Sequence, residues 1–174
     1  MKPLTKYASS LPALALCVLV LGSVAAFSQK SLALLRAGRP EVKVQLSATV
    51  ERDAVKIPVE KVSLLKPGEV LDWTIASVNE GNAPATEYNA VAKIPAGTQF
   101  VPGSAFSDKS AAVEFSLDNG KTFSANPTIE EKQADGSVKK VAAPISLYTQ
   151  IRYDWTDPLN QGETLKASYK VRLK

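Results

Sequence analysis

The sequence predicts an all-β protein, an antiparallel sandwich of about seven or eight strands in two sheets. Three observations lead to this fold class. Apolar and polar residues alternate along several segments, as they do in strands with one buried face. Turn residues separate these segments, since the 174 residues include eleven prolines and nine glycines. The segments also follow one another at the spacing typical of a two-sheet sandwich.

The N-terminus has the three parts of a secretory signal in residues 1–28. Lys2 and Lys6 begin it, an apolar core follows over residues 11–21, and small residues near its end form a cleavage site. Cys17 lies within the apolar core and is not placed as a lipidation site. We therefore expect a signal helix and export to the periplasm, cell surface or medium. An uncleaved membrane anchor is the alternative, and it would be the chain's only contact with a membrane.

The mature part of the chain is predicted to be one domain. Residues 29–41 contain a Gly-Arg-Pro break and are expected to be a flexible lead-in, and the sandwich domain then spans 42–174. Its first strand alternates clearly from residue 42 to residue 50. The side chains expected on its buried face are Val42, Val44, Leu46, Ala48 and Val50.

The segment from Lys66 to Ser104 is read as two strands joined by a turn. Leu71, Trp73 and Ile75 are expected inward on the first strand, and Tyr88, Ala90 and Ile94 share a face of the second. The preceding residues 55–65 contain Pro58, which suits an edge strand.

Two further features precede the last strands. Residues 113–117 form a strand, and Asp118-Asn119-Gly120 then signals a hairpin turn. Residues 125–146 are polar and irregular, and the sequence leaves open a two-stranded flap or a mobile loop.

Two strongly alternating strands close the chain. The first should bury Leu147, Thr149, Ile151, Tyr153 and Trp155, with Tyr148 pointing outward. The second should bury Leu165, Ala167, Tyr169, Val171 and Leu173. Trp73 and Trp155 are the expected large anchors of the core.

A series of short motifs occurs in order between residues 62 and 174. The motifs are Pro67-Gly68, Trp73-Thr74-Ile75, Asn79-Glu80-Gly81, Ala83-Pro84-Ala85-Thr86, Ile94-Pro95-Ala96-Gly97 and Phe100-Val101-Pro102-Gly103-Ser104. This series resembles the bacterial cell-envelope repeat catalogued as domain of unknown function eleven, and residues 115–123 and 151–155 resemble the later part of some members. The resemblance implies an immunoglobulin-like sandwich and an exported, non-catalytic module, with no ligand implied. The chain departs from the family at Ala92, where many members carry aspartate, and it holds one copy of a unit that often occurs in tandem.

The composition argues against most catalytic chemistry. The chain has no histidine, and its one cysteine lies in the predicted leader. A hydrolytic carboxylate pair would have to come from Asp154 and Asp157, which also suit a solvent-facing strand position and a turn before Pro158. Asp118-Asn119-Gly120 lacks the ladder of oxygen ligands that calcium requires. We therefore expect no enzyme, no cofactor and no metal.

The charge pattern suggests one candidate contact surface. The net charge is +4, but basic and acidic residues are interspersed, so we expect no nucleic-acid binding. One face of the final strand carries a basic row of Lys166, Lys170, Arg172 and Lys174, and Lys43 is a candidate neighbour. This row could contact a polyanion or a surface glycan. The alternative is a solvated strand face whose lysines prevent aggregation.

The sequence thus predicts an exported, non-catalytic β-sandwich module of the bacterial cell envelope with a structural, interaction or adhesion role. Its expected partners are other envelope proteins or a surface glycan. Two alternatives stay open, a polyanion- or glycan-binding module that uses the basic row and, more remotely, a hydrolase with a carboxylate pair.

Overall fold

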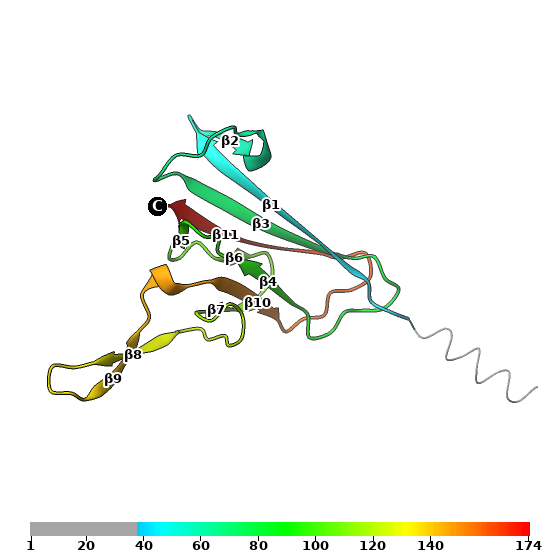
Figure 1. Cartoon of the computed structure of the whole chain (residues 1–174). Coiled ribbons are helices and arrows are strands. Elements are labelled where there is room, and N and C mark those ends of the chain that lie inside the picture. The colour runs from blue at the N-terminus through cyan, green and yellow to red at the C-terminus, as the bar shows by residue number, and fades with distance from the viewer. Residues whose placement is uncertain (1–37) are drawn as a thin grey trace, which may run out of the picture. The chain divides into compact units, whose positions relative to one another are not determined.

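The structure is a computed structural model, and it describes residues 38–174 (Figure 1). The predicted signal helix and residues 29–37 of the predicted lead-in lie outside the described residues. Within residues 38–174 the chain is all-β with antiparallel sheets, as the sequence predicts. None of the helices in this part of the chain is long and apolar enough to span a bilayer.

Nine of the eleven strands within residues 38–174 form two sheets. The larger sheet has the order β2-β1-β3-β11-β5, and β6 also pairs with β11. Its strands are β1 (Val42–Arg52), β2 (Val55–Pro58), β3 (Val70–Asn79), β5 (Thr98–Phe100), β6 (Phe106–Ser107) and β11 (Thr164–Leu173). The smaller sheet, in the order β4-β10-β7, consists of β4 (Asn89–Lys93), β10 (Gln150–Trp155) and β7 (Ala111–Ser116). The number of strands exceeds the prediction because several span only two to four residues, too few for an alternation to show in the sequence.

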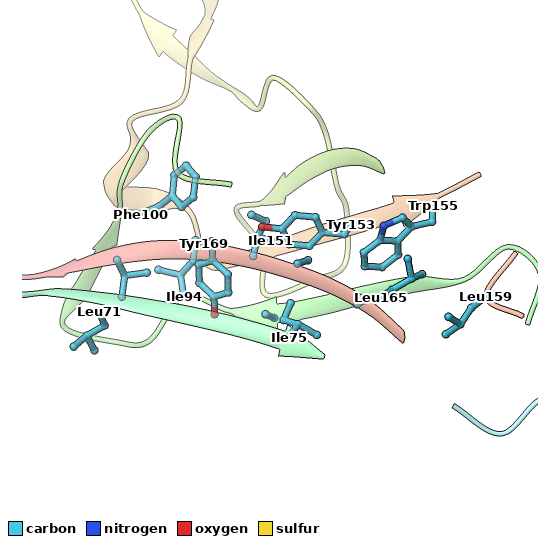
Figure 2. Close-up of a cluster of buried hydrophobic side chains, with 14 of the residues drawn as sticks. Leu71, Ile75, Ile94, Phe100, Ile151, Tyr153, Trp155, Leu159, Leu165 and Tyr169 are labelled. Carbon is cyan, nitrogen blue, oxygen red and sulfur yellow. The ribbon is translucent and has the colours of Figure 1, made fainter. Parts of the chain in front are cut away.

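One hydrophobic core receives side chains from both sheets (Figure 2). Leu71, Ile75 and Leu165 enter it from the larger sheet, and Ile151 and Trp155 enter it from the smaller one. The alternation of β10 and β11 is confirmed, since every second residue of both strands is buried until Leu173, which is partly exposed. Trp155 is buried as predicted, whereas Trp73 is only partly buried and packs against the margin of the core.

Two buried tyrosines tie the sheets together in opposite directions. Tyr153 of β10 donates its hydroxyl hydrogen to the carbonyl of Ser168 in β11, and Tyr169 of β11 donates its own to the carbonyl of Lys93 in β4, each over 2.7 Å. Both side chains are fully buried, and this burial raises the pKa of each hydroxyl above its usual value. Each sheet therefore supplies both a donor and an acceptor for the other.

The two strands predicted between Lys66 and Ser104 are present, but they lie in different sheets. β3 pairs with β1 and β11, whereas β4 pairs only with β10. The connection between them carries the chain from one layer to the other and is not a hairpin. The edge position predicted for the segment around Pro58 is confirmed, because β2 is the outermost strand of the larger sheet.

The burial predicted for the first half of β1 is wrong. Ala48 and Val50 are buried, but 57% of Val44 and 50% of Leu46 are exposed. These two residues have the same parity as the buried ones, so the pleat is as predicted. Val44 and Leu46 take no part in the shared core, although Val42 before them packs against it and Ala48 and Val50 after them are buried.

The start predicted for the tenth strand is also wrong. Leu147 lies in a short 3-10 helix, η2 (Ile145–Leu147), is 44% exposed, and β10 begins only at Gln150. Tyr148 does not simply face solvent, because its ring lies 4.7 Å from that of Phe115 and 6.4 Å from that of Phe100. Pro144 ends the alternation by starting a helical turn there.

Residues 125–146 form the two-stranded flap that was one of the two predicted alternatives. β8 (Thr128–Lys132) pairs with β9 (Val138–Ala142) and with no other strand (Figure 1). A turn with Gly136 at a φ of 85° joins them. Most of their side chains are exposed on both faces, so the hairpin contributes nothing to the core.

A fully buried asparagine ties three segments together at the end of β3. The Asn79 side-chain oxygen accepts hydrogen bonds from the backbone N–H groups of Glu41 and Gly81, and its Nδ2 donates to the carbonyls of Ala83 and Leu159. A Cβ on Gly81 would lie 2.3 Å from backbone atoms of the segment before β1. The Asn79-Glu80-Gly81 motif is therefore more than a turn signal, because it fixes the chain just before β1.

We predict that Asn79→Asp destabilises the fold. Aspartate keeps both acceptor positions but turns the two donated bonds into contacts between a carboxylate and carbonyl oxygens. The expected loss is at least about 2 kcal/mol, because buried groups left unsatisfied cost about 1–3 kcal/mol each. The measurement is chemical denaturation at neutral pH. The matched control is Asn82→Asp, where the side-chain oxygen only accepts a bond from the exposed Arg39 N–H and aspartate preserves it. Equal losses in the two variants would contradict this account.

An ion pair fixes the turn that precedes β3. Glu69 accepts two hydrogen bonds from the Arg52 guanidinium, over 2.7 and 3.0 Å, and one from the Lys66 N–H. These bonds, first those from Arg52 and then the one from Lys66, lower the pKa of Glu69 from 4.5 to about 2. The Lys66-Pro67-Gly68 turn is thereby attached to the end of β1.

We predict that this carboxylate contributes to the acid sensitivity of the protein. Because its folded pKa is lowered, its contribution is complete above pH 4.5 and disappears as the pH falls towards 2. Glu69→Gln should therefore lower the thermal midpoint at pH 7 and flatten its fall between pH 4.5 and pH 2. Thermal unfolding of both proteins across this range measures the effect. Parallel pH profiles of the two proteins would refute it.

Candidate anion-binding cleft

The structure divides the predicted basic row into two places. Lys166, Lys170 and Arg172 lie on the outer face of β11, where all three are exposed. Lys174 follows the end of β11 and lines a cavity instead. The predicted neighbour Lys43 is on the same outer face, two strands away from β11 and close in register to Lys166 but not to Arg172, and it forms an ion pair with Glu80.

The outer face is less positive than the sequence pattern suggests. Asp72 of β3 lies directly opposite Lys170 in the sheet, and Lys56 of β2 reaches the same carboxylate over 3.2 Å. Arg172 donates a hydrogen bond to the carbonyl of Gly68. Of the predicted basic residues on this face, neither Lys166 nor Lys170 has a side-chain hydrogen bond or ion pair to any residue in the range 38–174.

The cavity at Lys174, which we call the end cleft, has a volume of about 590 Å³. Volumes of this size are typical of small-molecule sites. Five segments contribute to it, the end of β4, the following turn, the loop after β7, the segment before β10 and the end of β11. The lining residues are Lys93, Ile94, Pro95, Ala96, Gly97, Thr98, Asn119, Ser146, Tyr148, Thr149, Gln150 and Lys174.

Hydrogen bonds of the fold fix the backbone at both lysines of the cleft. The carbonyl of Lys93 accepts the bond from the buried Tyr169, which fixes the end of β4. The N–H of Lys174 donates to the carbonyl of Gly97, and Gly97 has the positive φ of 78° that the turn requires. The turn between β4 and β5 is therefore held at one end by the core and near the other by the last strand.

The polar lining of the cleft is positive and rich in hydrogen-bonding groups. Lys93 and Lys174 are exposed, and neither forms an ion pair with another residue of the described part of the chain. None of the lining side chains is acidic. Hydroxyl or amide groups come from Thr98, Asn119, Ser146, Tyr148, Thr149 and Gln150. Tyr148 adds an aromatic ring that the Phe100 and Phe115 rings support. Two ammonium groups beside neutral donors suit a ligand that carries both negative charge and hydroxyl groups.

A rigid loop brings Asn119 to the cleft. The Asp118 carboxylate accepts hydrogen bonds from the backbone and hydroxyl of Thr122, the hydroxyl of Ser116 and the N–H of Lys121. These bonds hold the pKa of Asp118 far below its usual value of 3.8, with Thr122 the largest cause. The predicted turn is confirmed, since Asn119 and Gly120 have positive φ values and Phe115 forms an isolated bridge with Ser124.

The two aspartates considered for catalysis are placed differently from each other. Asp154 lies on the outer face of β10, 2.8 Å from the Arg152 guanidinium, which also pairs with Glu114 and lies over the Phe123 ring. Asp157 is exposed in the turn that follows β10. Among the described residues no group of three or more His, Cys, Asp or Glu side chains is arranged to hold a metal ion.

No protein family, curated protein or solved structure matches this chain. The resemblance to the envelope repeat therefore stays a prediction.

The sequence pointed to Lys174 but not to Lys93. Lys93 precedes Ile94-Pro95-Ala96-Gly97, a motif that predicts a strand end, and the lysine itself gives no separate signal. Lys93 and Lys174 line the same cavity because β5 lies beside β11. This strand pairing joins residues more than seventy positions apart in the sequence.

We predict that Asp118→Asn lowers the thermal midpoint by several degrees and loosens the loop, because an amide nitrogen would replace an acceptor that faces several donors. Amide hydrogen exchange at residues 119–122 measures the loosening. The matched control is Asp135→Asn, since Asp135 accepts similar bonds from Ser137 on the β8–β9 hairpin, outside the core. The account fails if the control lowers the midpoint as much as Asp118→Asn does.

Proposed function

We propose that this protein is an exported, non-catalytic module of the bacterial cell envelope whose end cleft binds an anionic glycan. The observation that carries the proposal is the presence of Lys93 and Lys174 in one cavity without an acidic side chain in its lining. A sugar chain bearing carboxylates, phosphates or sulfates would match the two ammonium groups, and its hydroxyl groups would match the neutral donors.

Export and an envelope location are supported by the signal-like residues 1–28 and by the resemblance to the envelope repeat. An immunoglobulin-like sandwich belongs to the same proposal. It is supported by two antiparallel sheets that share one core, with hydrogen bonds between them from Tyr153 and Tyr169. A rigid framework of this kind holds its end loops in place for binding.

The second candidate contact is the outer face of β11. Lys166 and Lys170 are exposed there and would meet an extended polyanion along the sheet. We rank this face below the cleft because Asp72 lies opposite Lys170 and already attracts Lys56. Its lysines also suit the protective role expected of charges on an exposed strand face.

The hydrolase alternative gains no support from the geometry. Asp154 is engaged by Arg152 on the surface of the smaller sheet, and Asp157 is an exposed turn residue. A pair of catalytic carboxylates would need a defined separation across a bound sugar.

We predict that the protein binds polygalacturonate, used as a probe, and that Lys93→Glu combined with Lys174→Glu weakens this binding about tenfold. Exposed charge pairs contribute about 0.2–1 kcal/mol each, and reversal replaces two attractions by two repulsions. Isothermal titration at low and high salt measures the affinity, and salt should weaken the binding of the wild type.

Two further double reversals make the experiment specific. Lys166→Glu with Lys170→Glu tests the outer face, and Lys132→Glu with Lys139→Glu makes the same charge change on the hairpin. A loss of affinity only in the cleft variant supports binding in the cleft. An equal loss of affinity in all three variants would mean that binding depends only on the net charge of the protein. Absence of binding by the wild type would overturn the proposal for this class of glycan.

A further inference from the structure

The edge of the larger sheet at β1 is open. β3 pairs with β1 from Val42 to Val50, whereas β2 reaches only Thr49–Arg52 on the other side. Along residues 42–48 nothing within the described part of the chain pairs with that second side. The outward-directed N–H and C=O groups of this stretch are therefore available to another strand.

Apolar side chains accompany this open edge. Val44 and Leu46 lie opposite Ser77 and Ile75 of β3, and directly opposite residues of an antiparallel pair share a face. Ser77 and Ile75 are 1% and 2% exposed, so Val44 and Leu46 are on the core side of the sheet, yet about half of each is exposed. A neighbouring strand would cover both the backbone and this apolar stripe.

The devices that usually protect an edge are missing from residues 42–48. This stretch contains no proline, and every residue on its core side is apolar. The one charged residue, Lys43, points to the outer face and is paired with Glu80 of its own chain. An inward-pointing charge or a proline would be the normal protection for such a strand.

We propose that a second copy of this chain covers the edge, with the two β1 strands antiparallel about a two-fold axis at Gln45. Gln45 is the midpoint of the open stretch, so this register gives the longest overlap that β2 permits. It places Val44 opposite Leu46 of the second copy, and Leu46 opposite Val44 of the second copy. Such apolar cross-strand pairs stabilise a sheet.

The charges favour a second copy in this register. Lys43 lies opposite Ser47 of the second copy, so no like charges face each other, and each lysine is ion-paired with Glu80 of its own chain. A register centred on Lys43 would place the two lysines opposite each other and shorten the overlap. The edge is therefore complementary to itself. This inference does not depend on the glycan proposal, because neither cleft lysine takes part.

Sedimentation velocity of the full chain over a range of micromolar concentrations tests the assembly. We expect a monomer–dimer equilibrium for the wild type and for Leu64→Lys, which adds the same charge at another leucine that is 70% exposed. Leu46→Lys should shift the dissociation constant upwards by at least about tenfold, because it places two charges in a two-fold apolar contact. A wild-type chain that stays monomeric would overturn the proposal and leave the edge free for a strand from another protein.

Cysteine crosslinking tests the register. In a Cys17→Ser chain, Gln45→Cys would place two cysteines directly opposite each other, with Cα atoms about 4.5–5.5 Å apart, a separation that a disulfide accepts. Ser47→Cys is the matched control, because the two copies of that residue would be offset by four positions, about 13 Å along the strands. Rapid oxidation to a covalent dimer only at position 45 supports the inference, and equal or reversed rates contradict it.

Discussion

The architecture depends on the two buried tyrosine hydroxyls that bond across the core. Tyr153 reaches from the smaller sheet to the larger, and Tyr169 reaches back, so each bond limits sliding of one layer over the other. The second bond ends on the carbonyl of Lys93, which is the residue whose side chain lines the end cleft. The contact that fixes the layers thus also fixes the backbone of one of the two lysines of the proposed binding site.

The two ends of β11 have different tasks. Near its start, Asn79 satisfies four backbone groups and joins the segment before β1 to two loops, with no exposed surface of its own. Near its end, the cleft leaves two lysines exposed and without an ion-pair partner in the described part of the chain. Near the start of β11 the polar groups form hydrogen bonds within the protein, and near its end they are exposed to solvent. This arrangement is expected of a framework that carries a binding surface.

Alternation in the sequence was enough to predict the all-β class and the inward faces of β10 and β11, and Pro58 was enough to predict the edge position of β2, because each follows from local patterning. The exposure of Val44 and Leu46 could not be predicted in this way. Their exposure depends on how much of the larger sheet the smaller sheet covers, and the sequence of β1 does not contain that information. The cleft could not be predicted for a similar reason. Lys93 and Lys174 come to line one cavity only because β5 pairs with β11. The helical turn at Leu147 was not predicted, because Leu147 continues the alternation of apolar residues in the strand that follows it.

The β8–β9 hairpin has a consequence for how the chain tolerates damage. Its base is closed by the bond from the Ala143 N–H to the Pro127 carbonyl, and β7 and β10, which flank it in sequence, pair with each other. A protease that cut the exposed turn near Gly136 would produce two fragments still joined by both sheets. The nicked protein would keep its core, and the hairpin can change in length or be exchanged for a foreign peptide without disturbing the layers beneath.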